Sequence, residues 1–377
     1  MPQPLVVIFH QAPRDGDPPL TALLARARAA LVRHQDLLFT RAGGRVAVVP
    51  GRDPRSGSHE TFGERLARLV ADEGVGTQGG LVVLGAGAVP LLTAADARRL
   101  VAVAASGAPV ALTNNRYSSD VCAVGSAGVL RTLPPLPSDN ALPRWLEERA
   151  GQAVTELPGR ERLAIDIDTP VDLALAARIP GLPASLRRLA ADEHIAIPRL
   201  DDLRALAADP HRELIVAGRS GSSTLRWLEA NVRCRVRFLA EERGLRASSE
   251  FAMGDPGRPV GANRTRGPDA GALPRRHPRT TLGRLLDIRG PDALEAMVGD
   301  LGDGAILDTR VLLADRLGAD EDAWPSAEDR FASDLLRPDA IADPWLRALT
   351  AAAAQAASPI LLGAHTVVGP GVRWLLR

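Results

Sequence analysis

Short apolar runs alternate with longer amphipathic segments along the first half of the chain. Strand-like runs cover residues 5–9, 45–50, 80–85, 108–115 and 162–168, and helix-like segments cover 20–39, 61–74, 93–106 and 141–151. Continuous apolar strands separated by helices are typical of parallel sheets, whose strands are buried on both faces and joined by crossover helices. The pattern therefore predicts an α/β protein with a mostly parallel sheet.

The same alternation resumes in the second half and predicts a second, three-layer α/β domain. We expect a first domain at 1–185, a helical connector at 186–210 and a second domain at 211–377. A chain of 377 residues is long enough for two hydrophobic cores. Residues 253–279 are rich in Pro, Gly and Arg, and this composition predicts a flexible loop.

The chain contains no lysine, and all 46 of its basic residues are arginine. This excludes Schiff-base chemistry, a P-loop lysine and a lysine general base. Any phosphate group that binds this protein must therefore be held by arginine, by backbone amides or by a metal ion.

Charge and cysteine content restrict the partners. The net charge is +1, so there is no overall attraction to nucleic acid or to a membrane. The arginine-rich region 258–289 contains no aromatic residue that could stack on bases. Two cysteines supply neither a disulfide framework nor a zinc site. Without a signal-peptide pattern or a long uncharged apolar run, we expect a cytoplasmic protein with no membrane partner, and the oligomeric state stays open.

The segment 163–177 carries the clearest chemical signal and reads LAIDIDTPVDLALAA. An apolar run ends on Asp166 and Asp168, and a helix follows with Thr169 as its N-cap and Pro170 at its first position. Two carboxylates beside a helix N-terminus can hold a divalent cation close to a phosphate. Alternatively, Asp168 and Thr169 only cap the helix.

A second motif lies earlier in the chain, where residues 80–101 read GLVVLGAGAVPLLTAADARRLV. Its part VVLGAGAVPLLTAADARRL is similar to the strand, acid, x-Pro-Leu-Leu-Thr and helix of nucleotidyltransferases with the glycosyltransferase-A type fold. The later segment DIDTPVDLALA resembles that family's Asp-x-Asp-Thr-Pro-x-Asp-Leu motif. Within the family, the chain looks most like molybdenum-cofactor guanylyltransferases and 2-phospholactate guanylyltransferases.

The resemblance covers roughly residues 1–185 and implies a glycosyltransferase-A type, Rossmann-like sheet there. It also implies a nucleotide or another phosphorylated small molecule as ligand and Mg²⁺ as cofactor. Asp168, with Asp166, would hold the metal while an acceptor phosphate or hydroxyl attacks the α-phosphate of the nucleotide.

Three departures from the family pattern motivate a competing hypothesis. Ala88 stands where the family has an acid that helps to hold magnesium. The family's Gly-rich phosphate loop is replaced by FHQAPRDGDPPLTALL, in which Arg14 is the candidate phosphate ligand. The segment LTNNRYSSDVCAV takes the place of the acceptor-binding segment without matching it closely. The alternative is a catalytically degenerate binding or regulatory protein on the same scaffold.

A dense polar run follows the fourth predicted strand. Loops at the carboxyl ends of parallel strands bind ligands in α/β sheets, so this run predicts contacts to a nucleotide or a phosphorylated acceptor. Its candidate binding residues are Asn114, Asn115, Arg116, Ser119 and Asp120. The alternative is an ordinary polar turn, because Asn and Ser favour turns for local reasons.

The second half contains its own candidate anion loop between a predicted strand and a predicted helix. Glycines let backbone amides converge on an anion, and hydroxyls add donors. The loop consists of Gly218, Arg219, Ser220, Gly221, Ser222 and Ser223. The alternative is a tight turn with Ser222 or Ser223 as helix cap. A third hypothesis places an active site in this domain, around Ser222, Asp308 and His365.

Overall fold

The computed structural model of the chain describes residues 3–51, 60–72, 79–136, 138–242 and 278–377. It consists of two compact units, unit 1 at Met1–Ala196 and unit 2 at Ile197–Arg377. The boundary falls between two helices, α7 at Ala184–Asp192 and α8 at Leu200–Ala208. The predicted connector 186–210 is therefore helical, but its helices are divided between the units. The predicted loop 253–279 lies outside the described residues, apart from its last two.

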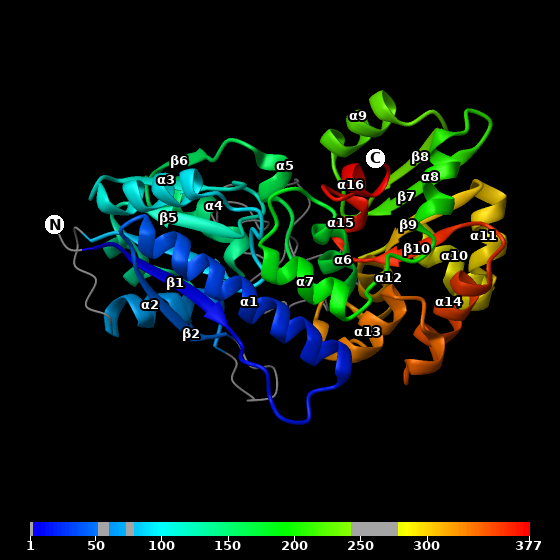
Figure 1. Ribbon diagram of the computed structural model, residues 1–377, viewed down its shortest axis with the longest axis horizontal. Helices are drawn as coiled ribbons and strands as arrows, with labels where there is room; N and C mark the ends of the chain where they lie inside the picture. The colour runs from blue at the N-terminus through cyan, green and yellow to red at the C-terminus, as the bar shows by residue number, and fades with distance from the viewer. Residues whose placement is uncertain (1–2, 52–59, 73–78, 137, 243–277) are drawn as a thin grey trace, which may run out of the picture. The chain divides into compact units, whose positions relative to one another are not determined.

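Unit 1 contains a six-stranded, mostly parallel sheet in the order β2-β1-β3-β5-β4-β6 (Figure 1). Its strands are β1 at Leu5–His10, β2 at Arg45–Pro50, β3 at Leu81–Gly85, β4 at Val110–Thr113, β5 at Val121–Val124 and β6 at Ala153–Glu156. Only β5 runs antiparallel to its neighbours β3 and β4. The α/β class and the mostly parallel sheet are confirmed.

Helices pack against the sheet of unit 1 and bury its central strands. The helices of unit 1, besides α7, are α1 at Pro19–Arg41, α2 at Phe62–Asp72, α3 at Ala94–Ala105, α4 at Leu142–Glu148, α5 at Arg160–Leu163 and α6 at Pro170–Ala177, with 3₁₀ turns η2 at Ala127–Thr132 and η3 at Asp139–Ala141. Ile8 of β1, Leu84 of β3 and Leu100 of α3 are at most 2% exposed and belong to one core cluster. Burial of such side chains is the main source of the unit's stability.

Two parts of unit 1 differ from the prediction. Residues 162–168 form the end of α5 and an irregular segment rather than a strand. Ile165 and Ile167 are fully buried, but the segment joins no ladder, and the Ile167 N–H instead donates to the Gly87 carbonyl at 2.9 Å. Conversely, the strands β5 and β6 were not predicted, because β5 directly follows a polar run and β6 buries only one of its four residues.

Unit 2 contains a four-stranded, fully parallel sheet in the order β10-β9-β7-β8. Its strands are β7 at Glu213–Gly218, β8 at Arg235–Ala240, β9 at Gly304–Asp308 and β10 at Ile360–Gly363. Besides α8, its helices are α9 at Ser222–Asn231, α10 at Thr281–Arg289, α11 at Leu294–Leu301, α12 at Thr309–Leu317, α13 at Ala327–Asp334, α14 at Pro344–Gln355, α15 at His365–Val368 and α16 at Val372–Leu375, with 3₁₀ turns η6 at Pro291–Ala293, η7 at Glu321–Ala323 and η8 at Pro338–Ala340.

The predicted helix start after the Asp-x-Asp motif is confirmed. Thr169 caps α6, its side chain accepts the Asp172 N–H, and the Asp172 carboxylate accepts the Thr169 N–H in return. Pro170 takes the first helical position. No helix in the described ranges is both long and apolar enough to span a membrane.

Candidate functional site

The carboxyl edge of the unit 1 sheet contains a topological switch point between β1 and β3. The chain places β2 on one side of β1 and β3 on the other, and such points leave a crevice where α/β proteins bind ligands. His10 ends β1 there, and the loop 85–88 follows β3. The segment 164–169 reaches the same loop through the bond between Ile167 and Gly87.

Arg28 of α1 binds the segment 164–169 and lies beside the loop 85–88. Its Nε donates to the Ile167 carbonyl at 3.1 Å, and a terminal nitrogen donates to Oδ1 of Asp168 at 2.9 Å. Gly87 is required by this close approach, because a Cβ at that position would lie 2.8 Å from the Ile167 oxygen and 3.2 Å from Nε of Arg28. A positive guanidinium group is therefore held directly beside the loop.

Among the described residues, two buried polar atoms near this edge have no hydrogen-bond partner. Gln35 of α1 is fully buried, and its Nε2 donates to the Ala88 carbonyl at 2.7 Å while its Oε1 has no hydrogen-bond partner. Nδ1 of His10 is likewise buried without a partner. Burial, and then the positive charges of Arg28 and Arg33, lower the pKa of His10. His10 is therefore neutral at physiological pH.

The loop between β4 and β5 is held together by its own polar side chains. Oδ1 of Asn114 accepts the N–H groups of Asp120 at 2.9 Å and Val121 at 3.2 Å, and its Nδ2 donates to the Leu163 carbonyl at 2.9 Å. The Ser119 hydroxyl pairs with that of Thr113 at 2.9 Å. Asn114 and Ser119 are buried, so these contacts favour the interpretation of a structured turn for both residues.

The other predicted binding residues of unit 1 are more exposed. Arg116 donates to the Val154 carbonyl at 2.7 Å and forms an ion pair with Glu147 at 3.0 Å. Oδ1 of Asn115 accepts the Tyr117 N–H at 3.1 Å. Arg14 lies in an exposed turn, where its N–H donates to Asp17 at 2.9 Å. Ligand contacts by these residues stay a prediction.

Three acids from distant parts of the sequence influence one another at this edge. Burial, and then the negative charge of Asp139, raise the pKa of Asp120 to about 8, and Asp168 adds to the rise. Burial and the charge of Asp168 raise the pKa of Asp139 to about 6. Asp120 accepts one hydrogen bond from Asn114 at 2.7 Å, which opposes the shift. Asp120 is therefore protonated at neutral pH, whereas Asp139 loses its proton near pH 6.

The two predicted metal ligands differ in exposure. The side chain of Asp168 is 51% exposed, whereas Asp166 is 8% exposed. Across the described ranges, no group of three or more His, Cys, Asp or Glu side chains is arranged to hold a metal ion. A protein cage that surrounds a cation is therefore not present there, and a metal role for Asp166 and Asp168 stays a prediction.

The carboxyl edge of the unit 2 sheet is closed by an ion pair at its own switch point, between β7 and β9. Arg219 donates to both oxygens of Asp308, at 2.6 and 3.1 Å. Burial alone would raise the pKa of Asp308, but the charges of Arg219 and Arg310 and the bonds from Arg219 hold it below its usual range. Gly218 has φ +138°, and a Cβ there would lie 2.2 Å from Cβ of Asp308.

A second ion pair lies next to the first, since the Arg310 N–H donates to Asp308 at 3.1 Å. Arg310 of α12 forms a two-pronged pair with Asp334 of α13, in which one bond measures 2.7 Å. Arg310 is 6% exposed and Asp334 is fully buried. Two arginines and two aspartates thus alternate across this edge, and their charges balance.

The predicted anion loop of unit 2 is a tight turn into α9. Gly221 is the N-cap and offers no side chain, so the prediction that Ser222 or Ser223 caps the helix is wrong. Both serines are exposed in the first turn, and the buried Ser220 hydroxyl has no hydrogen-bond partner within the described ranges. Anion binding by this loop stays a prediction.

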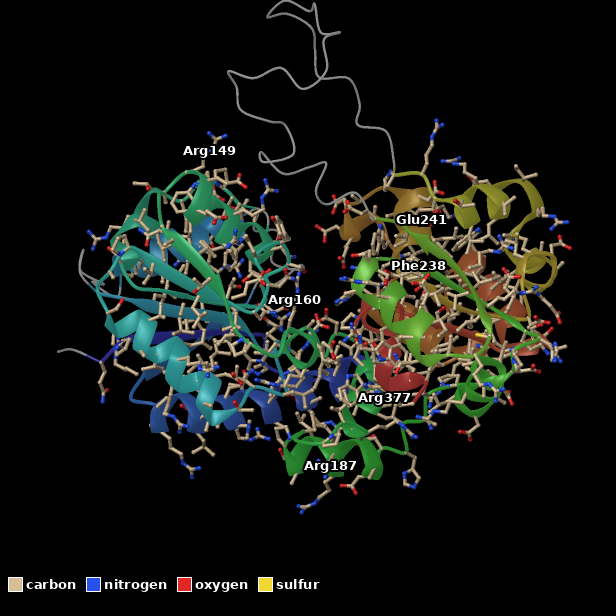
Figure 2. All side chains as sticks on the ribbon, turned by 90° about the horizontal axis from the view of Figure 1, so that it is seen from above. Arg149, Arg160, Arg187, Phe238, Glu241 and Arg377 are labelled. Atoms are coloured by element: carbon tan, nitrogen blue, oxygen red, sulfur yellow. The ribbon has the colours of Figure 1, made fainter. Side chains whose placement is uncertain are left out.

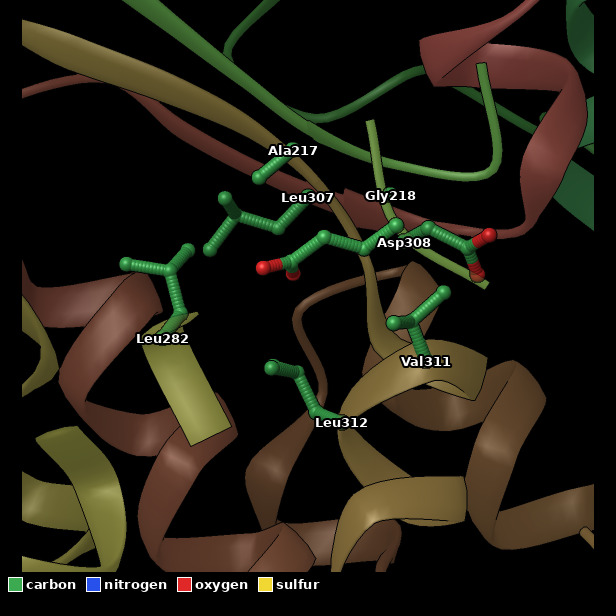
Figure 3. Close-up of a pocket in the computed structure, with 8 residues that line it drawn as sticks. Ala217, Gly218, Leu282, Leu307, Asp308, Val311 and Leu312 are labelled. Atoms are coloured by element: carbon green, nitrogen blue, oxygen red, sulfur yellow. The ribbon is translucent and has the colours of Figure 1, made fainter. Parts of the chain in front are cut away.

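Next to Asp308, a small apolar pocket lies between the sheet and the helices α10 and α12. Figure 3 shows Leu282 and Leu312 of these helices facing Leu307 of β9. Glu241, labelled just past the end of β8 in Figure 2, also lines it and accepts the Thr281 N–H at 2.6 Å. His365 begins α15 after β10, and its charge lowers the pKa of Asp308 further.

Arg28, Gln35 and Asp139 were not among the residues predicted from the sequence. Arg28 and Gln35 are seven residues apart on α1, so both lie on one face of the helix. The signal that could have identified this face is a glutamine among apolar residues, since Gln35 stands at a buried position. Asp139 lies in a short 3₁₀ turn, and no pattern in the sequence identified it.

The chain was also compared with known proteins. No protein-family model matches it, and neither does any curated protein. Among solved structures it is similar to a crystal structure from Desulfovibrio desulfuricans G20, described as a "putative nucleotide-diphospho-sugar transferase", with 16% sequence identity and a TM-score of 0.38. The match covers 52% of this chain and 95% of the other. A likeness at this TM-score says nothing of what this chain binds.

Proposed function

We propose that unit 1 binds a nucleotide, or another phosphorylated small molecule, together with a divalent cation, and that it serves a transferase-type reaction. The observation that carries this proposal is the meeting of Arg28 and Asp168 at the switch point of the sheet. A guanidinium group suits a phosphate, and a carboxylate suits a hard cation. Both groups are within hydrogen-bond distance of each other and beside the loop 85–88.

The donor chemistry of the edge fits magnesium in one mode. Mg²⁺ usually keeps several waters and takes one or two protein carboxylates, with phosphates of the substrate as further ligands. Asp168 fits this mode because half of its side chain is exposed, and Asp166 would be the second carboxylate. When bound, the ion would neutralise part of the phosphate charge.

Asp120 and Asp139 supply groups that can carry a proton. A carboxyl group with a pKa near 8 is protonated at neutral pH and can donate, and one with a pKa near 6 is mostly ionised and can accept. We assign these two acids the role of moving a proton at the acceptor. Transfer of a nucleotide to a hydroxyl acceptor requires that the hydroxyl loses its proton.

A thermal-shift screen tests the proposal. The purified chain is melted with ATP, GTP, CTP and UTP, each with Mg²⁺ and with EDTA. A ligand that binds only the folded state raises the melting temperature by mass action. We expect a base-selective rise that requires Mg²⁺, and we expect Asp168→Ala to remove the Mg²⁺-dependent part. No shift with any of the four nucleotides would contradict nucleotide binding by unit 1.

Unit 2 offers a second candidate function, favoured by one observation. The Ser220 hydroxyl is buried without a partner at the entrance of α9, whose N-cap Gly221 leaves the first N–H groups without a side-chain acceptor. A phosphate there would satisfy both. Soaking a crystal in inorganic phosphate separates the candidates, because density beside Ser220 and not beside Arg28 would move the anion site to unit 2.

A further inference from the structure

Arg28 and Asp168 serve opposite halves of the ligand proposed for unit 1, and yet they are bonded to each other. Arg28 would take a phosphate and Asp168 the cation, but the guanidinium nitrogen and Oδ1 of Asp168 lie 2.9 Å apart. A phosphate oxygen that bonds this guanidinium group competes with Asp168 for it. A cation at Asp168 repels the guanidinium group in turn.

The pair is easily exchanged because it is exposed. Its two side chains are 34% and 51% exposed, and ion pairs of this kind contribute little to stability. The bond from Nε of Arg28 to the Ile167 carbonyl, at 3.1 Å, does not depend on Asp168. Arg28 can therefore stay at the edge while the partner of its terminal nitrogens changes.

We infer that the Arg28–Asp168 ion pair couples the binding of a phosphate to the binding of a divalent cation. A phosphate that engages Arg28 releases Asp168 for the cation, and a cation at Asp168 releases Arg28 for the phosphate. Such coupling is reciprocal, because each ligand changes the affinity for the other by the same factor. The inference rests on the proposed function of unit 1.

A second observation points to a ligand at the same loop. Gln35 is fully buried and donates to the Ala88 carbonyl at 2.7 Å, but its Oε1 has no hydrogen-bond partner in the part of the chain that the structure describes. A buried acceptor without a donor is costly, and such atoms are usually satisfied by a ligand or by water. Arg28 and Gln35 belong to the same helix, and both lie against the loop 85–88, Arg28 beside Gly87 and Gln35 at the Ala88 carbonyl.

The coupling makes a prediction that a merely structural ion pair would not make. Removing one partner should increase the affinity for the ligand of the other. Arg28→Ala should bind Mn²⁺ alone up to about fivefold tighter than the parent chain, measured by the loss of the free-ion electron paramagnetic resonance signal. Asp168→Ala should bind inorganic tripolyphosphate in EDTA up to about fivefold tighter, measured by calorimetry. Fivefold corresponds to about 1 kcal/mol, the upper range for exposed pairs.

The matched control lies on the same helix. Arg26 pairs with Glu193 at 2.7 Å, and the two side chains are 50% and 34% exposed. Arg26→Ala removes an equivalent exposed ion pair, and we expect it to leave both affinities unchanged. Arg28→Gln and Asp168→Asn repeat the test with side chains of similar size, in case either alanine variant folds poorly.

Two negative results are distinguishable. If the parent chain binds Mn²⁺ and tripolyphosphate but neither variant binds its probe more tightly, the coupling is overturned while the proposed function stands. If neither probe binds the parent chain or any variant, both the coupling and the proposed function are overturned.

Discussion

The acids at the carboxyl edges of the two sheets differ in their partners. In unit 2, Asp308 and Asp334 are buried and each is held by two bonds from an arginine. In unit 1, the negative charge of Asp139 raises the pKa of Asp120, and Asp168 forms an exposed ion pair with Arg28. Burial raises the pKa of Asp334 too, but the bonds from Arg310 tie that acid to the structure, whereas Asp120 and Asp139 are our candidates for contact with a ligand or a proton.

We expect the largest effect from breaking the buried Arg310–Asp334 ion pair at the sheet edge of unit 2. Arg310→Ala leaves the fully buried Asp334 without its partner, so we expect a loss of about 3–5 kcal/mol in the free energy of unfolding of unit 2. Tryptophan fluorescence in urea measures it, since Trp227, Trp324, Trp345 and Trp374 lie in unit 2 and only Trp145 lies in unit 1.

The control for that prediction is a variant at the sheet edge of unit 1, where the Arg28–Asp168 ion pair is exposed. Arg28→Ala breaks an exposed pair in unit 1 and should cost less than about 1 kcal/mol. If the two variants lose similar amounts, the contrast between a closed and an open edge is wrong.

A smaller effect concerns pH. Because the pKa of Asp120 is raised to about 8, the stability that this group contributes is complete below about pH 4 and is lost as the pH rises through 8. Asp120→Asn removes this dependence. We expect the variant to melt about 5 °C above the parent chain at pH 9 and at nearly the same temperature at pH 4.

An acid of unit 2 should show the opposite sign. Arg212 donates to Asp303 and holds the pKa of Asp303 below its usual range. The stability from this group is present above about pH 4 and is lost as the pH falls. Asp303→Asn should therefore lower the melting temperature at pH 7 more than at pH 3. If the melting temperatures of the Asp120 and Asp303 variants, relative to the parent chain, change with pH in the same direction, the opposite pKa shifts of these two acids are refuted.

We expect the smallest effect on stability from a substitution at Gly221, the N-cap of α9. Gly221 has φ −145° and ψ 174°, and nothing lies within 4 Å of a Cβ built on it. Gly221→Asp should cap the helix and stabilise unit 2 by about 0.5 kcal/mol in the same urea experiment. If this loop binds phosphate, the new carboxylate will also abolish that binding, whereas binding at Arg28 will be unaffected.

Much of the fold could be predicted because apolar periodicity is local. The alternation located four strands of unit 1 and predicted a second α/β domain, and Thr169 with Pro170 located the start of α6. The segment 162–168 was misread because Ile165 and Ile167 are buried as strand residues are, although their backbone joins no ladder. Strand β5 was hidden because four apolar residues end a polar run.

The candidate site was less accessible to sequence reasoning, because it depends on tertiary contacts. Asp168 and Asp120 stand in recognisable local patterns. Arg28, by contrast, is one of several arginines on α1, and only its contact with Asp168, 140 residues further along the chain, distinguishes it. Asp139 is likewise identified only by its effect on the pKa of Asp120.

The contact between Gly87 and Ile167 has a consequence for affinity. A backbone hydrogen bond of 2.9 Å joins two loops that lie 80 residues apart, and the missing side chain of Gly87 lets Arg28 rest on both. Because these loops are already ordered against each other, a ligand would not have to pay the conformational entropy of bringing them together. Preorganisation of this kind would let a small ligand bind with few contacts, and a methyl group at position 87 would remove that advantage by pressing on the Ile167 carbonyl and on Arg28.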